Sequence, residues 1–163
     1  MFACGVRTGH NPLMATKAYI ALGSNQGDRR AHLSAALDAL RSLPGVLSVE
    51  PAPIYETDPV GGPAGQGKFL NTVAAVNTDL SPKQLLAELN QIEADRGRDR
   101  QAETERCAPR TLDLDILLFG NEIIDASGDF VLRPLNDIAP DAVHPVLKRT
   151  VRELLAELEA ATP

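Results

Sequence analysis

The segment that most restricts the fold is "RTLDLDILLFG", residues 110–120. It contains the most apolar run of the chain, yet Asp113 and Asp115 stand in it, two residues apart. Because alternate residues of a strand share a face, both aspartates point to one side with Thr111, and the leucines between them point to the core. The alternation stops after Asp115, and "ILLF" is typical of a strand buried on both faces. The segment therefore predicts a strand whose polar face is confined to its N-terminal end.

Two interpretations of the aspartate pair are open on these residues alone. Charged side chains can protect an exposed edge strand against aggregation. Alternatively, two carboxylates this close together repel each other unless a cation lies between them, and Mg²⁺ prefers a few carboxylates plus water and phosphate oxygens. Two Mg²⁺ ions can be bridged by such a pair. The second interpretation makes Asp113 and Asp115 metal ligands.

The segment before this strand, residues 97–110, is charged and lacks an apolar period, so we predict a mobile loop. It carries four arginines, Arg98, Arg100, Arg106 and Arg110. Guanidinium groups suit phosphate oxygens, and an acidic pair beside them indicates a metal and a polyphosphate bound together. The alternative is a solvated loop in which the arginines pair with Glu103 and Glu105.

Hydrophobic periodicity predicts the remaining elements. Strands are expected at residues 19–23, 46–57 and 68–80, the second interrupted by prolines. A helix follows the first strand, and Ser81 and Thr150 are expected to begin two more. Residues 134–140 suggest a turn or a short helix. The order strand, helix, strand, strand, helix, strand, then a last helix is a split β-α-β pattern, which predicts an α+β fold with an antiparallel-rich sheet.

Length and composition fit one domain, which we place at residues 16–163 after a leader, residues 1–15, without regular structure. Translation can begin at Met1 or at Met14. The net charge of −6 and the pI near 5.0 argue against binding to nucleic acid or to an anionic membrane. Cys4 and Cys107 are too far apart in sequence to indicate a disulfide framework or a metal motif, which suits the cytoplasm. We expect a monomer.

Four segments together resemble one known family. "YIALGSN", "KFLNTVAAV", "IEADRGR" and "PRTLDLDILLFGNEII" occur in the order found in 6-hydroxymethyl-7,8-dihydropterin pyrophosphokinase, an enzyme of folate synthesis. The resemblance implies a ferredoxin-like α+β fold with helices on both faces of the sheet. It also implies transfer of the pyrophosphoryl group of Mg-ATP to the pterin hydroxymethyl group, which leaves AMP.

The resemblance assigns roles to individual residues. Asp113 and Asp115 would hold two Mg²⁺ ions, and Arg98 and Arg110 would contact the triphosphate as catalytic residues. The nucleotide site would also include Glu93 and Ile116. The pterin pocket would be lined by Thr57, Val60, Phe69, Asn71 and Phe130. Asn71 can donate and accept hydrogen bonds at the ring edge, and the two phenylalanines can stack on the ring faces, although without the resemblance we would assign both to the core.

The sequence departs from the family pattern in four places. Asp58 stands between Thr57 and the proline that usually follows it, Cys107 replaces an aromatic residue, and the arginine loop is longer. After "NEII" the family has a strand and a loop with "PHP" and then an arginine, whereas here "DASGD" leads directly to Phe130. The absent histidine and arginine suggest an alternative function, a catalytically impaired member that still binds pterin or nucleotide. A split β-α-β order also suits RNA-binding sheets, but the acidic pI and the few aromatic residues argue against that function.

Overall fold

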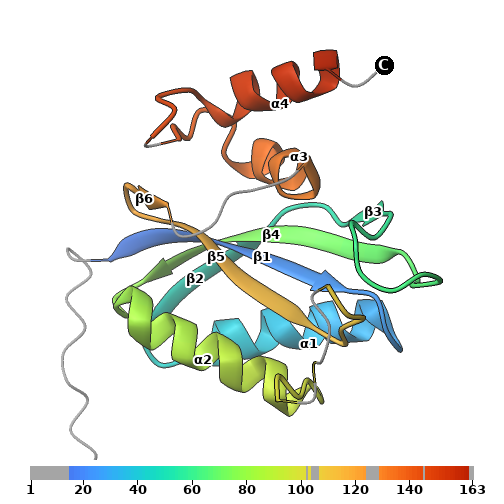
Figure 1. Cartoon of the computed structure of the whole chain (residues 1–163). Helices are drawn as coiled ribbons and strands as arrows, with labels where there is room; N and C mark the ends of the chain where they lie inside the picture. The colour runs from blue at the N-terminus through green and yellow to red at the C-terminus, as the bar shows by residue number, and fades with distance from the viewer. Residues whose placement is uncertain (1–14, 102, 104–106, 124–128, 145, 162–163) are drawn as a thin grey trace, which may run out of the picture.

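A computed structural model describes residues 15–101, 103, 107–123, 129–144 and 146–161, and Figure 1 shows one sheet between two layers of helices. The strands are β1 (Thr16–Ser24), β2 (Val46–Pro51), β3 (Tyr55–Thr57), β4 (Phe69–Thr78), β5 (Asp113–Phe119) and β6 (Glu122–Ile123). The helices are α1 (Arg29–Ser42), α2 (Pro82–Asp95), α3 (Asp129–Ile138) and α4 (Val151–Ala161). The predicted leader lies outside the described residues, except for its last residue.

The strands run in the order β2-β4-β1-β5-β6, and β3 pairs with the opposite end of β4 from β2. Every described pairing is antiparallel. Strand β1 is central because its residues alternate between two buried faces, with Ala18, Ile20 and Leu22 all fully or almost fully buried on one of them. The predicted antiparallel-rich sheet is therefore confirmed.

Helices α1 and α2 cover the lower face of the sheet (Figure 1). Leu33 and Leu40 of α1 and Leu85 and Leu89 of α2 pack with Leu114 of β5 in one apolar cluster, and all five are completely buried. Each helix presents these leucines at a spacing of four or seven, as an amphipathic helix on a sheet requires. This layer confirms the face that the sequence assigns to the core.

Polar side chains fix the starts of the helices. Asp28 accepts a hydrogen bond from the backbone N–H of Ala31 and begins α1. Ser81 and Gln84 form a capping box at α2, with Pro82 at its first position, and Thr150 and Glu153 exchange equivalent hydrogen bonds at α4. Each pair satisfies backbone donors that have no partner inside the helix. The predictions for Ser81 and Thr150 are confirmed.

The upper face is covered by α3, and α4 lies beyond it, farther from the sheet (Figure 1). Val131 and Leu135 of α3 pack against Val73 of β4 and Leu117 of β5. The expectation of a turn or short helix at residues 134–140 was wrong in its bounds, because α3 has ten residues and contains Pro134. Proline removes a helical hydrogen bond, and the burial of Val131 and Leu135, one turn apart, offsets that cost.

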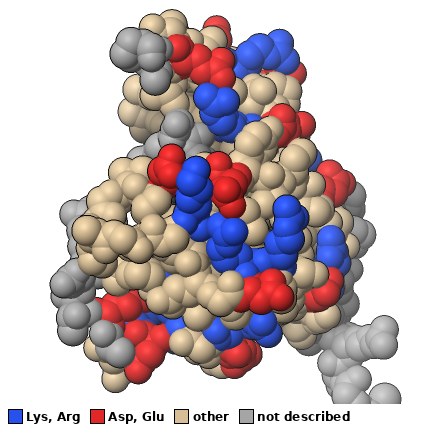
Figure 2. Space-filling view, turned by 90° about the vertical axis from the view of Figure 1, so that its right-hand side faces the viewer, with Lys and Arg blue, Asp and Glu red and all other residues tan. Residues whose placement is uncertain are grey.

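The surface has no single-sign field on the face shown in Figure 2, where basic and acidic side chains alternate over the molecule. Among the ion pairs of the described residues, Arg29 lies 3.1 Å from Glu56, and Lys68 lies 3.4 Å from Asp58. A nucleic-acid surface would gather the basic groups into one patch. Within the described residues, every helix is too short or too polar to cross a membrane.

Candidate active site

The floor of the candidate site is formed by three neighbouring strands on the upper face. Gly23 of β1 lies opposite Asn71 of β4 on one side and opposite Asp113 of β5 on the other. Two residues further along the same pair of strands, Ala21 of β1 lies opposite Asp115 of β5. An added Cβ at Gly23 would lie 2.8 Å from Oδ1 of Asn71. A glycine at this point therefore leaves room for Asn71 between the strands.

A pocket opens above this floor, and two loops close its sides. Its lining comprises Ala21, Leu22, Gly23, Thr57, Asp58, Pro59, Val60, Gly61, Phe69, Asn71, Thr72, Cys107, Ala108, Arg110, Asp113 and Asp115. Within the pocket, Nδ2 of Asn71 donates to Oγ1 of Thr57 over 2.6 Å. The acidic pair and the predicted pterin-binding groups thus line one pocket, although they come from segments distant in sequence.

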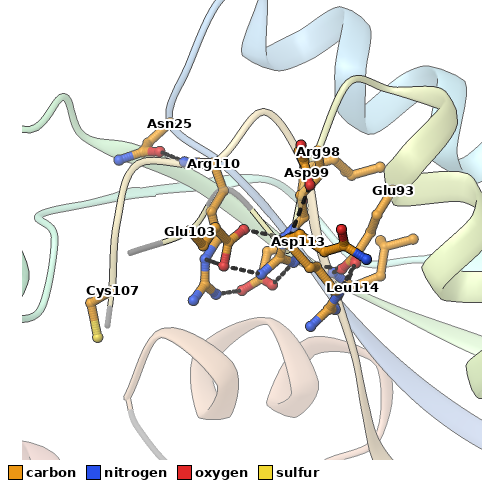
Figure 3. Close-up of polar contacts among 12 residues, drawn as sticks. Asn25, Glu93, Arg98, Asp99, Glu103, Cys107, Arg110, Asp113 and Leu114 are labelled. Atoms are coloured by element: carbon orange, nitrogen blue, oxygen red, sulfur yellow. Dashed lines mark hydrogen bonds and ion pairs between the residues drawn. The ribbon is translucent and has the colours of Figure 1, made fainter. Parts of the chain in front are cut away.

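Arg98 is the centre of a buried ionic cluster beside the pocket (Figure 3). Its side chain is 3% exposed, and it donates to Glu93 over 2.7 Å, to Glu103 over 2.7 Å and to Asp113 over 2.5 Å. Burial opposes the charge of Arg98, but the hydrogen bond to Glu103 and the charges of Asp113 and Glu93 raise the pKa of the guanidinium above its ordinary value. Arg98 therefore stays charged inside the protein.

Glu93 of α2 connects this cluster to the edge of β5. Its Oε1 accepts from Arg98 and, over 2.7 Å, from the backbone N–H of Leu114, the residue between the two aspartates. Its Oε2 accepts from Arg100 over 2.6 and 2.9 Å. Among the described strands, β1 alone pairs with this end of β5, so Glu93 occupies a position that another strand would otherwise take.

Arg110 holds the second oxygen of Asp113. Its Nη1 donates to Oδ2 of Asp113 over 2.7 Å, while Arg98 occupies Oδ1. Nε of Arg110 is buried and has no hydrogen-bond acceptor among the described residues, and the nearest ion-pair oxygen, on Glu103, is 4.0 Å away. A buried donor without an acceptor is costly, and this one belongs to a residue that lines the pocket. It is suited to receive an anionic oxygen from a ligand.

The hydrogen bond from Arg98 lowers the pKa of Glu103, and burial opposes this effect only in part. The charges of Arg98, Arg110 and Arg100 act in the same direction as that hydrogen bond. The alternative in which loop arginines pair with Glu103 is therefore correct for Arg98, but the pairing is internal to the cluster and is not a solvated surface contact.

The structure brings most of the predicted site residues together. Thr57, Val60, Phe69, Asn71, Arg110, Asp113 and Asp115 all line the pocket. Glu93, Arg98 and Ile116 do not: the first two are in the buried cluster, and Ile116 faces the lower core. Phe130 lies in the first turn of α3, and its side chain, like residues 124–128 of the "DASGD" connection, is outside the described part of the structure.

Several pocket and loop residues were missed from the sequence. Gly23 and Asn25 belong to "ALGSNQGD", which is neither a P-loop nor a dinucleotide fingerprint and gave only a weak phosphate-site signal. Gln66 lies in the loop between β3 and β4, and the composition of that loop gives no indication of a function. The signal that identifies Gly23 is the strand register, which places it between Asn71 and Asp113.

A pair of carboxylates and an arginine at one pocket suit an enzyme that acts on phosphate groups, and comparisons identify the family. The family model for 7,8-dihydro-6-hydroxymethylpterin-pyrophosphokinase (HPPK) matches residues 19–140. A 2-amino-4-hydroxy-6-hydroxymethyldihydropteridine pyrophosphokinase of Pseudomonas aeruginosa is 45% identical over 154 residues, which cover 88% of this chain and 92% of that protein. A protein of the same name from Haemophilus influenzae is 43% identical over 139 residues, with 78% and 84% covered. The chain belongs to the HPPK family.

Solved structures support the fold. The crystal structure of Plasmodium falciparum HPPK-DHPS matches with a TM-score of 0.67 and 14% identity, over 90% of this chain. The matched region is 45% of that longer chain, so this chain spans less than half of it. At this identity the likeness concerns the fold alone, and it agrees with the predicted α+β architecture.

Proposed function

We propose that this chain transfers the pyrophosphoryl group of ATP to the hydroxymethyl group of 6-hydroxymethyl-7,8-dihydropterin, giving AMP and the pterin diphosphate in folate synthesis. The relatives that cover most of the chain are named for this pyrophosphokinase activity. The observation that carries the proposal is the single pocket in which Asp113, Asp115 and Arg110 lie beside Asn71, Thr57 and Phe69. Such a pocket offers a charged half for a polyphosphate and a half suited to a flat, polar ring.

The pterin would lie against β4. Asn71 has an amide that can both donate and accept at the edge of a pterin ring, and its bond to Thr57 fixes the orientation of that amide. Phe69 lies next to Gly23 and can cover a ring face. A contact with Phe130 rests on the family resemblance.

The donor set of Asp113 and Asp115 fits Mg²⁺, which takes one or two carboxylates and completes its shell with water and phosphate oxygens. The described residues contain no group of three or more side chains that could hold a metal without such help. Asp113 and Asp115 would therefore hold the two Mg²⁺ ions of the proposed reaction together with phosphate oxygens of ATP. When bound, the ions neutralise charge on the phosphate oxygens.

In the reaction, the hydroxymethyl oxygen forms a bond to the β-phosphorus of ATP, and the bond from that phosphorus to the oxygen shared with the α-phosphate breaks. AMP leaves with that oxygen, and the hydroxyl proton passes to solvent. Arg110 would donate its buried Nε–H to a phosphate oxygen, which gives that donor the acceptor it lacks. Such transfer depends mainly on positioning and on neutralising charge.

Without a ligand, both oxygens of Asp113 accept hydrogen bonds from arginines. Each oxygen has a second lone pair, so Asp113 could hold a cation with these bonds in place, and a guanidinium that left Asp113 would be available to a phosphate oxygen. For Arg98, a direct contact with the triphosphate would require it to leave Glu93 and Glu103 as well. We therefore expect Arg110 to make the first phosphate contact.

The activity is tested by measuring AMP formed from ATP with and without the dihydropterin, in Mg²⁺ and in excess chelator. The proposal expects AMP only when pterin and Mg²⁺ are both present. Pterin-independent AMP formation, or turnover unaffected by chelator, would contradict it.

A second candidate function follows from the short "DASGD" connection. The resemblance places a histidine and an arginine in the segment that this chain lacks, and a cationic donor of that kind contributes about 10³-fold or more to phosphoryl transfer. An impaired member would bind ATP analogue and pterin but form AMP slowly. Binding titrations alongside the turnover assay separate the two candidates, and sequencing the gene between the codons for Ile124 and Phe130 shows whether the segment is truly absent.

A further inference from the structure

Two loops line the sides of the pocket, and one side chain connects them to each other and to Asn25, in the segment after β1. Gln66, in the loop between β3 and β4, donates from Nε2 to the carbonyl oxygen of Gly61 over 3.2 Å and to that of Cys107 over 3.1 Å. Its Oε1 accepts from Nδ2 of Asn25 over 3.2 Å. Gly61 and Cys107 both line the pocket, one in the β3–β4 loop and the other in the arginine loop.

Asn25 connects Gln66 to Arg110, the residue proposed to contact phosphate. Its Oδ1 accepts from the backbone N–H of Arg110 over 2.7 Å, and its own N–H donates to the carbonyl oxygen of Arg110 over 3.1 Å. Figure 3 shows Asn25 beside the backbone of Arg110, above the ionic cluster. Both backbone polar groups of Arg110 are thus bonded to Asn25, at the point where the side chain of Arg110 turns toward Asp113.

The two loops approach each other so closely at Gly62 that a side chain there would collide with the opposite loop. At Gly62, whose φ is 79°, an added Cβ would lie 2.3 Å from the carbonyl oxygen of Cys107 and 2.4 Å from Nε2 of Gln66. Cys107 itself has a φ of 61°, which is uncommon for a residue with a side chain. Close approach and unusual backbone at one point indicate that these loops are held in a fixed relation at the pocket wall.

We infer that Gln66 is a positioning residue for the proposed reaction: it sets the β3–β4 loop, which lines the pterin side, against the segment that carries Arg110. This inference rests on the proposed function. Gln66 itself does not line the pocket, so it acts through Gly61, Cys107 and Asn25.

Two variants test the hydrogen bonds of Gln66. Gln66→Met keeps the length of the side chain and removes all three hydrogen bonds, whereas Gln66→Glu keeps the acceptor for Asn25 and loses both donations. Gln91→Met is the matched control, because Gln91 is exposed on α2 and bonds only to Asp95 among the contacts described. Pterin affinity is measured in the presence of a saturating non-hydrolysable ATP analogue. Nucleotide affinity is measured with the same analogue in the absence of pterin.

Both Gln66 variants should weaken pterin binding about 10-fold, which corresponds to one or two neutral hydrogen bonds, and change nucleotide affinity less than about 3-fold. Hydrogen exchange of the Arg110 amide in the unliganded protein should become faster, and Gln91→Met should change none of these quantities. Wild-type pterin affinity and exchange in both variants would overturn the inference. So would equal losses of pterin and nucleotide affinity, or a fall in melting temperature above about 8 °C, because these would show a purely structural role.

The exchange measurement also separates this inference from the proposed function. If the wild-type protein neither binds pterin nor forms AMP, the proposed function fails, while faster exchange at Arg110 in the Gln66 variants still shows the connection between the loops. If the wild-type protein is active and both variants match it, the inference fails alone.

Discussion

Along the upper face of β5, Asp113 and Asp115 give way to Leu117, and the change falls where the cover of α3 begins. Leu117 packs with Val131 and Leu135 of α3 in an apolar cluster. Asp113 lies in the pocket with its oxygens held by arginines. One strand therefore contributes to a core at one end and to a polar site at the other, and its pairing with β1 shifts register at Leu117, where the apolar end begins.

The lower face of the same strand shows no such change. Leu114 and Ile116, together with Leu112 just before the strand, are all buried in the cluster formed with α1 and α2, on the side opposite the pocket. One face of β5 can therefore be fully buried while the other face of the same strand segment carries a polar site. The lower face supplies stability, which frees the upper face at this end of the strand to carry charge.

The largest expected effect is on turnover. Asp115→Asn should reduce AMP formation about 10³-fold or more, because it removes a proposed metal ligand, while the melting temperature stays near that of the wild type. Asp113→Asn should reduce turnover as much. Turnover near the wild-type rate in either variant would refute the metal assignment.

Stability should distinguish these two aspartate variants. Removing either charge would by itself relieve the repulsion between the two carboxylates and stabilise the protein. The ion pairs of Asp113 reverse that expectation for this residue, because its substitution weakens the compensation of the buried Arg98. Thermal unfolding should show a lower melting temperature for Asp113→Asn than for Asp115→Asn, and identical values would contradict the importance of these pairs.

The next effect is on the lower face. Leu114→Ala should lower the free energy of unfolding by about 2–5 kcal/mol, since it leaves a cavity at a fully buried position. At permissive temperature the folded fraction should keep nucleotide affinity within a few-fold of the wild type. Denaturant unfolding measures the first quantity and a binding titration the second. A loss below about 1 kcal/mol would show that the core can close around the missing side chain.

A smaller effect is expected at the pocket floor. Gly23→Ala places a Cβ 2.8 Å from Oδ1 of Asn71, the end of a side chain that can move. We expect about 10-fold weaker pterin binding and a stability change below about 1 kcal/mol. Gly67→Ala is the control, because its Cβ would meet its nearest neighbour, the carbonyl oxygen of Asn25, at 3.4 Å. Unchanged pterin affinity in Gly23→Ala would place the ring elsewhere in the pocket.

The smallest effect concerns acid stability. The pKa of Glu103 lies below its ordinary value near 4.5 in the folded protein, so its stabilising contribution is complete above that value and is lost as pH falls through the lowered folded pKa. Glu103→Gln should therefore make stability less dependent on pH below about 4.5. Melting curves from pH 3 to 6 measure the slope, and an unchanged slope would exclude Glu103 as a source of acid sensitivity.

Local patterns in the sequence were sufficient for most of the fold. The alternation in residues 111–115 identified both faces of β5, and Ser81 and Thr150 identified the starts of two helices, because capping involves residues three apart. The bounds of α3 were not predictable in this way. Pro134 argues against a helix locally, and only the packing of Val131 and Leu135 on the sheet compensates.

For the site, the sequence by itself determined which groups are present: an acidic pair on one strand face, arginines before it, and an asparagine and phenylalanine on another strand. Tertiary structure alone decided how they are engaged. Arg98 is buried among three carboxylates, whereas Arg110 lines the pocket, although both stand in one charged segment. The sequence around the two arginines does not show which one is buried, because both are charged residues of the same segment. Only the packing of α2 against β5, which brings Glu93 to Arg98, makes Arg98 a buried cation and leaves Arg110 able to reach a ligand.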